Sequence, residues 1–114
     1  MLYDPKTNPV IKALYDAADI VEQRGLTKYT KQDRRGRVCL HGAISLAVGE
    51  DHCETGSLHL EIAFAVRRYL RKEYGFEEAT ILWDCAAWTD ADERTQAEVV
   101  AALRETASML VVGG

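Results

Sequence analysis

Cysteine is scarce in this chain, with three residues in 114. An odd number at irregular spacing excludes the disulfide framework that stabilises small secreted domains. Residues 1–5 lack the charged and then apolar run of a secretory signal. No apolar stretch approaches the ~20 residues that a membrane-spanning helix needs. We therefore expect a cytoplasmic protein with free thiols and no membrane contact.

Metal-ligating and phosphate-binding motifs are also missing. The candidate soft metal ligands are Cys39, His41, His52, Cys53 and His59. None of them has the CxxC or HxxxH spacing that indicates a zinc site. On one helix, two residues separated by one position lie ~200° apart, which places Cys39 and His41 on opposite faces. No glycine-rich phosphate loop occurs either. We expect no metal and no cofactor.

The composition is that of an ordinary globular domain. Hydrophobic residues make up 47% and charged residues 28% of the chain, and this balance is typical of neither a disordered nor a membrane protein. A length of 114 residues suits one domain and leaves no room for a second. We therefore assign residues 1–114 to a single domain.

The first predicted helix covers residues 9–24. Asn8 suits the N-cap, Pro9 suits the first helical position, and Gly25 suits a left-handed C-terminal stop. Between them, apolar residues recur at the spacing of one helix face. A second predicted helix, residues 38–48, is apolar nearly all round and stops at Gly49; a buried strand is the alternative, and the alanines and leucines favour the helix. This assignment buries Cys39, so its thiol should resist alkylation, whereas Cys53 should react readily.

Two further helices are predicted downstream. Ser57 suits the cap of the third, which ends at Gly75. Its inward stripe consists of Leu58, Ile62, Ala65, Val66, Tyr69 and Leu70. Thr95 and Glu98 form a capping box that opens the last helix. The inward positions of that helix are Val99, Val100, Leu103, Ala107 and Leu110. Residues 79–88 fit either a strand or a short helix. The predicted fold is all-α: four or five short helices around an apolar helix near residues 39–48.

The net charge of −4 conceals a basic segment, residues 24–37. We expect this segment to be an exposed loop, because it has no apolar period. Its candidate partner-binding residues are Lys28, Tyr29, Lys31, Arg34, Arg35 and Arg37. A loop of this kind can contact an acidic partner, and Tyr29 can stack on a base. The acidic balance of the whole chain argues against nucleic acid.

Two tryptophans and three aspartates form a second candidate site. Its residues are Trp83, Asp84, Trp88, Asp90 and Asp92. As a pocket, they would offer an aromatic wall and acids to a cation, an amine or a sugar. As structural residues, the tryptophans would close the core and the aspartates would precede the last helix, where acids are stabilised. We favour the structural interpretation, because a helix that opens at Thr95 needs such an entry segment.

Several short motifs follow one another in a recognisable order. They read Gly36-x-Val38-Cys39-Leu40-x-Gly42-Ala43-Ile44, then Trp88-x-Asp90, then Arg94-Thr95-x-x-Glu98-Val99. This order resembles a small family of unknown function found in actinobacteria and in the phages that infect them, over roughly residues 10–107. Family members often carry asparagine where this chain has Thr89. The resemblance implies no activity or catalytic residue; it implies that the recurring residues serve the fold and that the protein is phage-encoded.

Three function classes follow. The leading hypothesis is a non-enzymatic interaction or regulatory protein that binds a macromolecular partner, a host protein, through the basic loop, the acidic faces or both. The alternative is a small-molecule-binding domain or an enzyme that uses residues 83–92. The third is nucleic-acid binding through residues 24–37 together with Arg67, Arg68 and Arg71.

Overall fold

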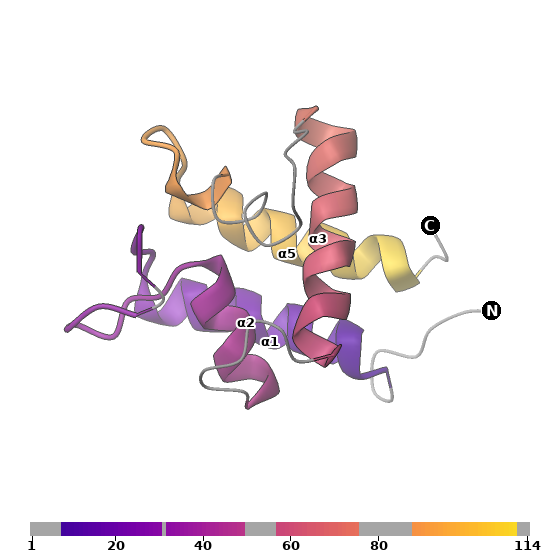
Figure 1. The fold of residues 1–114 in the computed structure, drawn as a ribbon, viewed down its shortest axis with the longest axis horizontal. Coiled ribbons are helices and arrows are strands. Elements are labelled where there is room, and N and C mark those ends of the chain that lie inside the picture. Colours follow the sequence, from indigo (N-terminus) through magenta and orange to yellow (C-terminus); the bar gives the residue numbers. More distant parts are fainter. Residues whose placement is uncertain (1–7, 31, 50–56, 76–87, 112–114) are drawn as a thin grey trace.

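The computed structural model describes residues 8–30, 32–49, 57–75 and 88–111, and it is helical (Figure 1). The helices are α1 (Pro9–Arg24), α2 (Leu40–Val48), α3 (Ser57–Tyr74) and α5 (Gln96–Val111). Residues 88–90 are helical as well. Within the described ranges there is no strand, only isolated bridges that pair Val38 with Leu26 and with Gln32. The prediction of an all-α domain is confirmed.

Helix α1 begins and ends at the predicted residues. The Asn8 side chain accepts hydrogen bonds from the backbone N–H groups of Val10 (2.9 Å) and Ile11 (3.1 Å), which satisfies two donors that the helix leaves free. The expected left-handed helical conformation at Gly25 is wrong, because φ is 91° and ψ is 163°. Gly25 donates to Val21 O (2.8 Å), and its own carbonyl accepts from Val38 N (3.0 Å). The chain therefore leaves α1 extended, in a conformation open to glycine.

Helix α2 confirms the helical interpretation of the apolar run, with one correction. The helix begins at Leu40, and Cys39 is its N-cap, with Sγ accepting from Gly42 N at 3.3 Å. Cys39 is partly exposed, so the expectation of a buried thiol is wrong. The N-cap position lies at the end of the helix, outside the apolar surface that residues 40–45 bury. Gly49 ends the helix in the left-handed conformation.

The inward stripes of the last two long helices are confirmed in their centres. Ile62, Val66 and Leu70 of α3 are fully buried, as are Val99 and Leu103 of α5. The outermost predicted members are only partly buried and pack against the core; they are Leu58 and Leu110. Figure 1 shows α1 and α5 running across the molecule and α3 crossing them, and α1 contacts α2, α3 and α5.

A pair of buried histidines links α2 to α3. His41 is 4% exposed and His59 is fully buried, with His41 Nδ1 at 3.0 Å from His59 Nε2. The other ring nitrogen of His59 lies 3.4 Å from Ser45 Oγ. Buried polar groups are stable only when they are hydrogen-bonded, and these two rings satisfy one another. The sequence pattern points to these histidines only as candidate metal ligands, and it gives no sign that they pair.

Two searches cover only the described part of the chain. None of its helices has the length and apolar character needed to cross a bilayer. No three of its His, Cys, Asp and Glu side chains are grouped as metal ligands. His52, Cys53 and residues 79–87 lie outside the described residues, whereas Trp88 is helical. The expectation of no metal therefore stays a prediction, as does the choice between strand and helix at residues 79–87.

Candidate functional site

The basic loop between α1 and α2 is hydrogen-bonded along its length. Thr27 N donates to Val38 O (2.9 Å), and Asp33 N donates to Arg37 O (3.0 Å). A turn closes where Gly36 N donates to Asp33 O (3.1 Å), and Gly36 has a φ of 82°. Tyr29, Arg34, Arg35 and Arg37 are exposed, as predicted, whereas residues 25–28 are partly buried. The described backbone is fixed near both ends of the loop and at its turn.

Asp33, the acid within this basic segment, organises the turn. Its Oδ1 accepts from Arg35 N (3.0 Å) and Arg37 N (2.9 Å), and its Oδ2 accepts from the Arg37 guanidinium. Desolvation raises the pKa of Asp33, but the hydrogen bonds from Arg37 and Arg35 outweigh it and the pKa is lowered. Sequence reasoning missed this residue. Aspartate followed three positions later by glycine is the usual signature of a type I turn.

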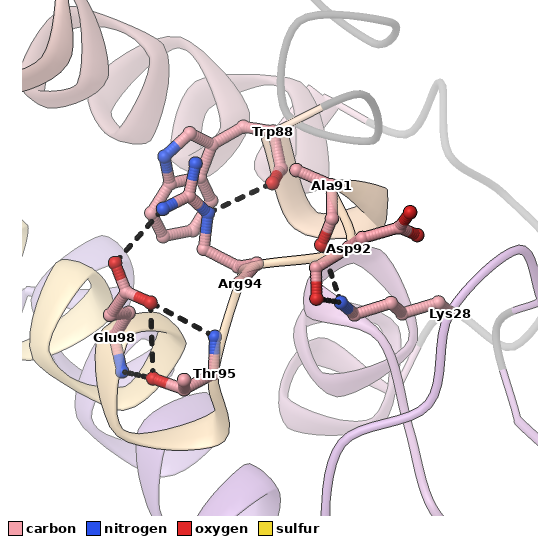
Figure 2. Close-up of polar contacts among 7 residues, drawn as sticks. All are labelled: Lys28, Trp88, Ala91, Asp92, Arg94, Thr95 and Glu98. Atoms are coloured by element: carbon pink, nitrogen blue, oxygen red, sulfur yellow. Dashed lines mark hydrogen bonds and ion pairs between the residues drawn. The ribbon is translucent and has the colours of Figure 1, made fainter.

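The start of the loop is bound to residues 90–92, which lie just before α5. Lys28 Nζ donates to the carbonyls of Ala91 and, at 3.2 Å, of Asp92 (Figure 2). Tyr29 N donates to Asp90 Oδ1 (2.9 Å), and Tyr29 OH donates to Asp90 O (3.2 Å). Lys28 and Tyr29 of one candidate site of the sequence analysis therefore contact Asp90 and Asp92 of the other. Asp90 holds the loop through this contact.

Tyr29 presents an aromatic ring to solvent from a strained backbone. Its φ is 66°, the one positive φ among the non-glycine residues that the structure describes, and its side chain is 77% exposed. A bulky side chain in the left-handed region costs of order 1 kcal/mol or more. The hydrogen bonds to Asp90 hold the residue in this conformation, so the position of the ring is imposed by the fold.

Arg94 holds residues 88–95 in place. Its guanidinium lies 4.2 Å from the ring centre of Trp88 and 5.2 Å from that of Tyr74, the last residue of α3. Nε donates to Trp88 O (3.0 Å), and Nη1 pairs with Glu98 Oε2 (2.9 Å) (Figure 2). Only 10% of the Arg94 side chain is exposed. The arginine thus joins the end of α3, Trp88 and the first turn of α5.

The predicted capping box is confirmed, and it starts α5. Glu98 N donates to Thr95 Oγ1 (3.2 Å), while Thr95 N donates to Glu98 Oε1 (3.0 Å). The hydrogen bond from the Thr95 backbone N–H is the main reason that the pKa of Glu98 lies below its ordinary value of 4.5. Desolvation opposes this shift, and the hydrogen bonds from Thr95 Oγ1 and Arg94 add to it.

This lowered pKa predicts an acid-dependent loss of stability. A carboxylate with a lower pKa in the folded state stabilises the fold above its unfolded pKa, and the contribution is lost as the pH falls through the folded value. Glu98→Gln should therefore be less stable than the parent at neutral pH, and the difference should shrink by about pH 3. Urea unfolding at both pH values measures it. Glu93→Gln, on an exposed neighbour, is the control; a constant difference for Glu98→Gln would contradict the prediction.

The remaining candidate residues differ in whether they are exposed, buried or outside the described part of the chain. Arg34 and Arg35 are exposed, and Arg37 is committed to Asp33. Trp88 is 1% exposed and belongs to the core, so its ring offers no face to a ligand. Asp92 is exposed. The candidate residues Lys31, Trp83 and Asp84 lie outside the described part of the chain.

Two surface hollows lie away from the candidate site. One, of about 320 Å³, is open between α3 and α5, beside the hydrogen bond from Tyr69 to Glu105. The other, of about 630 Å³, lies between α1 and α5, over Val100 and Ala101.

Comparison with known proteins gives one match. A model of a family of unknown function, DUF6197, matches residues 5–109. Searches of curated proteins and of solved structures find no match. The resemblance to a small family of unknown function is thereby confirmed at the level of the family. The chain belongs to the DUF6197 family.

Proposed function

We propose that this protein is a non-enzymatic interaction protein that binds an acidic surface of a protein partner through its basic loop. The contact residues are Tyr29, Arg34 and Arg35, with Lys28 and Lys31 beside them in the sequence. The observation that carries the proposal is Tyr29: an aromatic ring, 77% exposed, on a strained residue that Asp90 holds in place.

A fixed aromatic ring and exposed arginines on one loop are the residue types of a binding hot spot. Tyrosine and arginine are enriched among the residues whose truncation costs most binding energy. The hydrogen bonds of Lys28, Tyr29 and Asp33 fix the loop before any partner arrives. A surface that is already ordered loses less conformational entropy on binding. A merely solvated run of charges would not need these bonds.

The charge distribution favours a protein over a nucleic acid. Arg34 and Arg35 make the tip of the loop positive, which attracts an acidic patch and speeds association. The chain as a whole carries −4, and a long polyanion would be repelled by the rest of its surface. If the protein is encoded by a phage, a host protein is the natural partner.

Charge removal at the tip tests the electrostatic part. We expect the double substitution Arg34→Ser with Arg35→Ser to leave stability within about 0.5 kcal/mol per site, because both residues are exposed. Binding to the partner captured by the parent protein should weaken mainly through slower association, with a smaller salt dependence. Surface plasmon resonance at two salt concentrations measures this. Unchanged association would contradict the proposal, and salt-dependent retention on DNA by the parent would favour the nucleic-acid alternative.

Tyr29→Gly tests the aromatic part. Glycine adopts a positive φ without strain and keeps the backbone bond to Asp90 Oδ1, although the hydroxyl bond to Asp90 O is lost. The loop should therefore keep its path, and the protein should melt close to the parent. The ring is lost, and binding should fall by about tenfold or more if Tyr29 is an anchor. Affinity capture followed by titration of the captured partner measures the loss. The control is Tyr15→Ala, which removes a tyrosine that is 36% exposed. Alanine is used there because Tyr15 lies in α1, where glycine would destabilise the helix.

A further inference from the structure

The outward face of α3 is self-complementary, and we infer that it pairs with the same face of a second copy of this chain. Phe64 is 49% exposed, although α3 buries Ile62, Val66 and Leu70 on its other side. In Figure 1, α3 crosses α1 and α5 with its length on the outside of the molecule. An exposed phenylalanine at the middle of such a helix is the apolar centre of the proposed contact.

The charges on either side of Phe64 have opposite sign. Glu61 lies three residues before it and Arg68 four residues after it, and both are exposed. At 100° per residue, both lie on the same flank of the stripe, within about 60° of Phe64. Arg71 and Lys72 continue the positive end by one more turn, and they are exposed as well. The face is therefore acidic toward its start, apolar at its centre and basic toward its end.

An antiparallel pair about Phe64 brings these charges together. With a rise of about 1.5 Å per residue, Glu61 lies about 4.5 Å before Phe64 and Arg68 about 6 Å after it. A two-fold axis that places the two Phe64 rings in contact sets Glu61 of each copy at nearly the height of Arg68 of the other, on the same flank. Each pair of helices then makes two ion pairs around one aromatic contact, as expected of an isologous interface.

Charge complementarity selects this occupant over a foreign one. A long polyanion or an anionic membrane would meet Glu61 as well as the arginines, and like charges at an interface are costly. A second copy in antiparallel orientation satisfies both signs with residues already on the face. The contact is one helix wide, so the pair exchanges with free monomer. The inference is independent of the partner proposed for the basic loop.

Sedimentation equilibrium of the purified full chain tests the pairing. Between about 10 µM and about 1 mM, the mean mass should rise from that of a monomer toward that of a dimer, as mass action requires. Phe64→Ser should remain monomeric over the same range. Tyr15→Ser, which removes a partly exposed aromatic ring from α1, should associate like the parent. A parent that stays monomeric throughout, or a Phe64→Ser protein that associates like it, would overturn the inference.

Charge reversal tests the register without touching the apolar centre. Glu61→Arg and Arg68→Glu should each raise the dimer dissociation constant by about tenfold, because each leaves like charges opposed. The double variant restores opposite signs, so its constant should return to within about threefold of the parent value. Far-ultraviolet circular dichroism checks that each variant is folded. If the losses of dimerisation free energy in the two single variants simply added in the double variant, the antiparallel pairing would be refuted.

Discussion

Replacing Trp88 with alanine should lower the free energy of unfolding by about 3–5 kcal/mol, the usual cost of deleting a large buried aromatic side chain. Trp88 is 1% exposed, and its ring contacts both Tyr74, at 5.3 Å between centres, and the Arg94 guanidinium. Small domains are stable by about 5–15 kcal/mol in total, so much of the stability would be gone. Urea unfolding followed by circular dichroism measures the change.

Trp88→Phe is the matched control for this substitution. The indole Nε1 is buried and has no hydrogen-bond partner in the part of the chain that the structure describes. Phenylalanine keeps a ring in the core and removes this unsatisfied donor, which offsets part of the lost packing. We therefore expect Trp88→Phe to cost clearly less than Trp88→Ala. If Trp88→Ala melted like the parent, the Trp88 ring would not be part of the core. The hypothesis of a ligand pocket at residues 83–92 would then be favoured.

Replacing Arg94 with alanine should have the second largest effect, a loss of about 2–4 kcal/mol. The estimate combines two cation–π contacts with hydrogen bonds to a carboxylate and a carbonyl, in a side chain that is largely desolvated. The loss should also reach the candidate site, because the Arg94 side chain binds the carbonyl of Trp88, three residues before Ala91, whose own carbonyl binds Lys28. Hydrogen exchange at residues 27–37 should therefore become faster in Arg94→Ala.

Arg104→Ala is the matched control, because Arg104 also forms ion pairs but lies on the surface. Its guanidinium pairs with Asp19 (3.1 Å) and Glu22 (3.2 Å), and 40% of the side chain is exposed. Exposed pairs of this kind contribute about 0–1 kcal/mol. If Arg94→Ala proved no more destabilising than Arg104→Ala, the aromatic contacts of Arg94 would have no energetic role, and Arg94 would not be the residue that fixes the loop.

The sequence by itself determined where the helices lie. Asn8, Pro9 and the pair Thr95 with Glu98 are start signals whose hydrogen bonds form within a few residues of one another. The apolar period then told which face of each helix is buried, because the period is a property of one helix alone. The apolar pattern gave the wrong burial for Cys39. This residue lies among apolar residues in the sequence, yet it is the N-cap of α2 and is partly exposed.

Only the tertiary structure decided what the candidate site is. Tyr29 and Asp90 are 61 positions apart, and no local pattern says that they meet. The same holds for His41 and His59, which meet 18 positions apart in the core. The sequence names Arg94 only as part of a short motif, and its contacts with the rings of Tyr74 and Trp88 appear only in the folded chain. Such pairs depend on how the helices pack, and packing depends on the shapes of all the buried side chains together, which no window of the sequence contains.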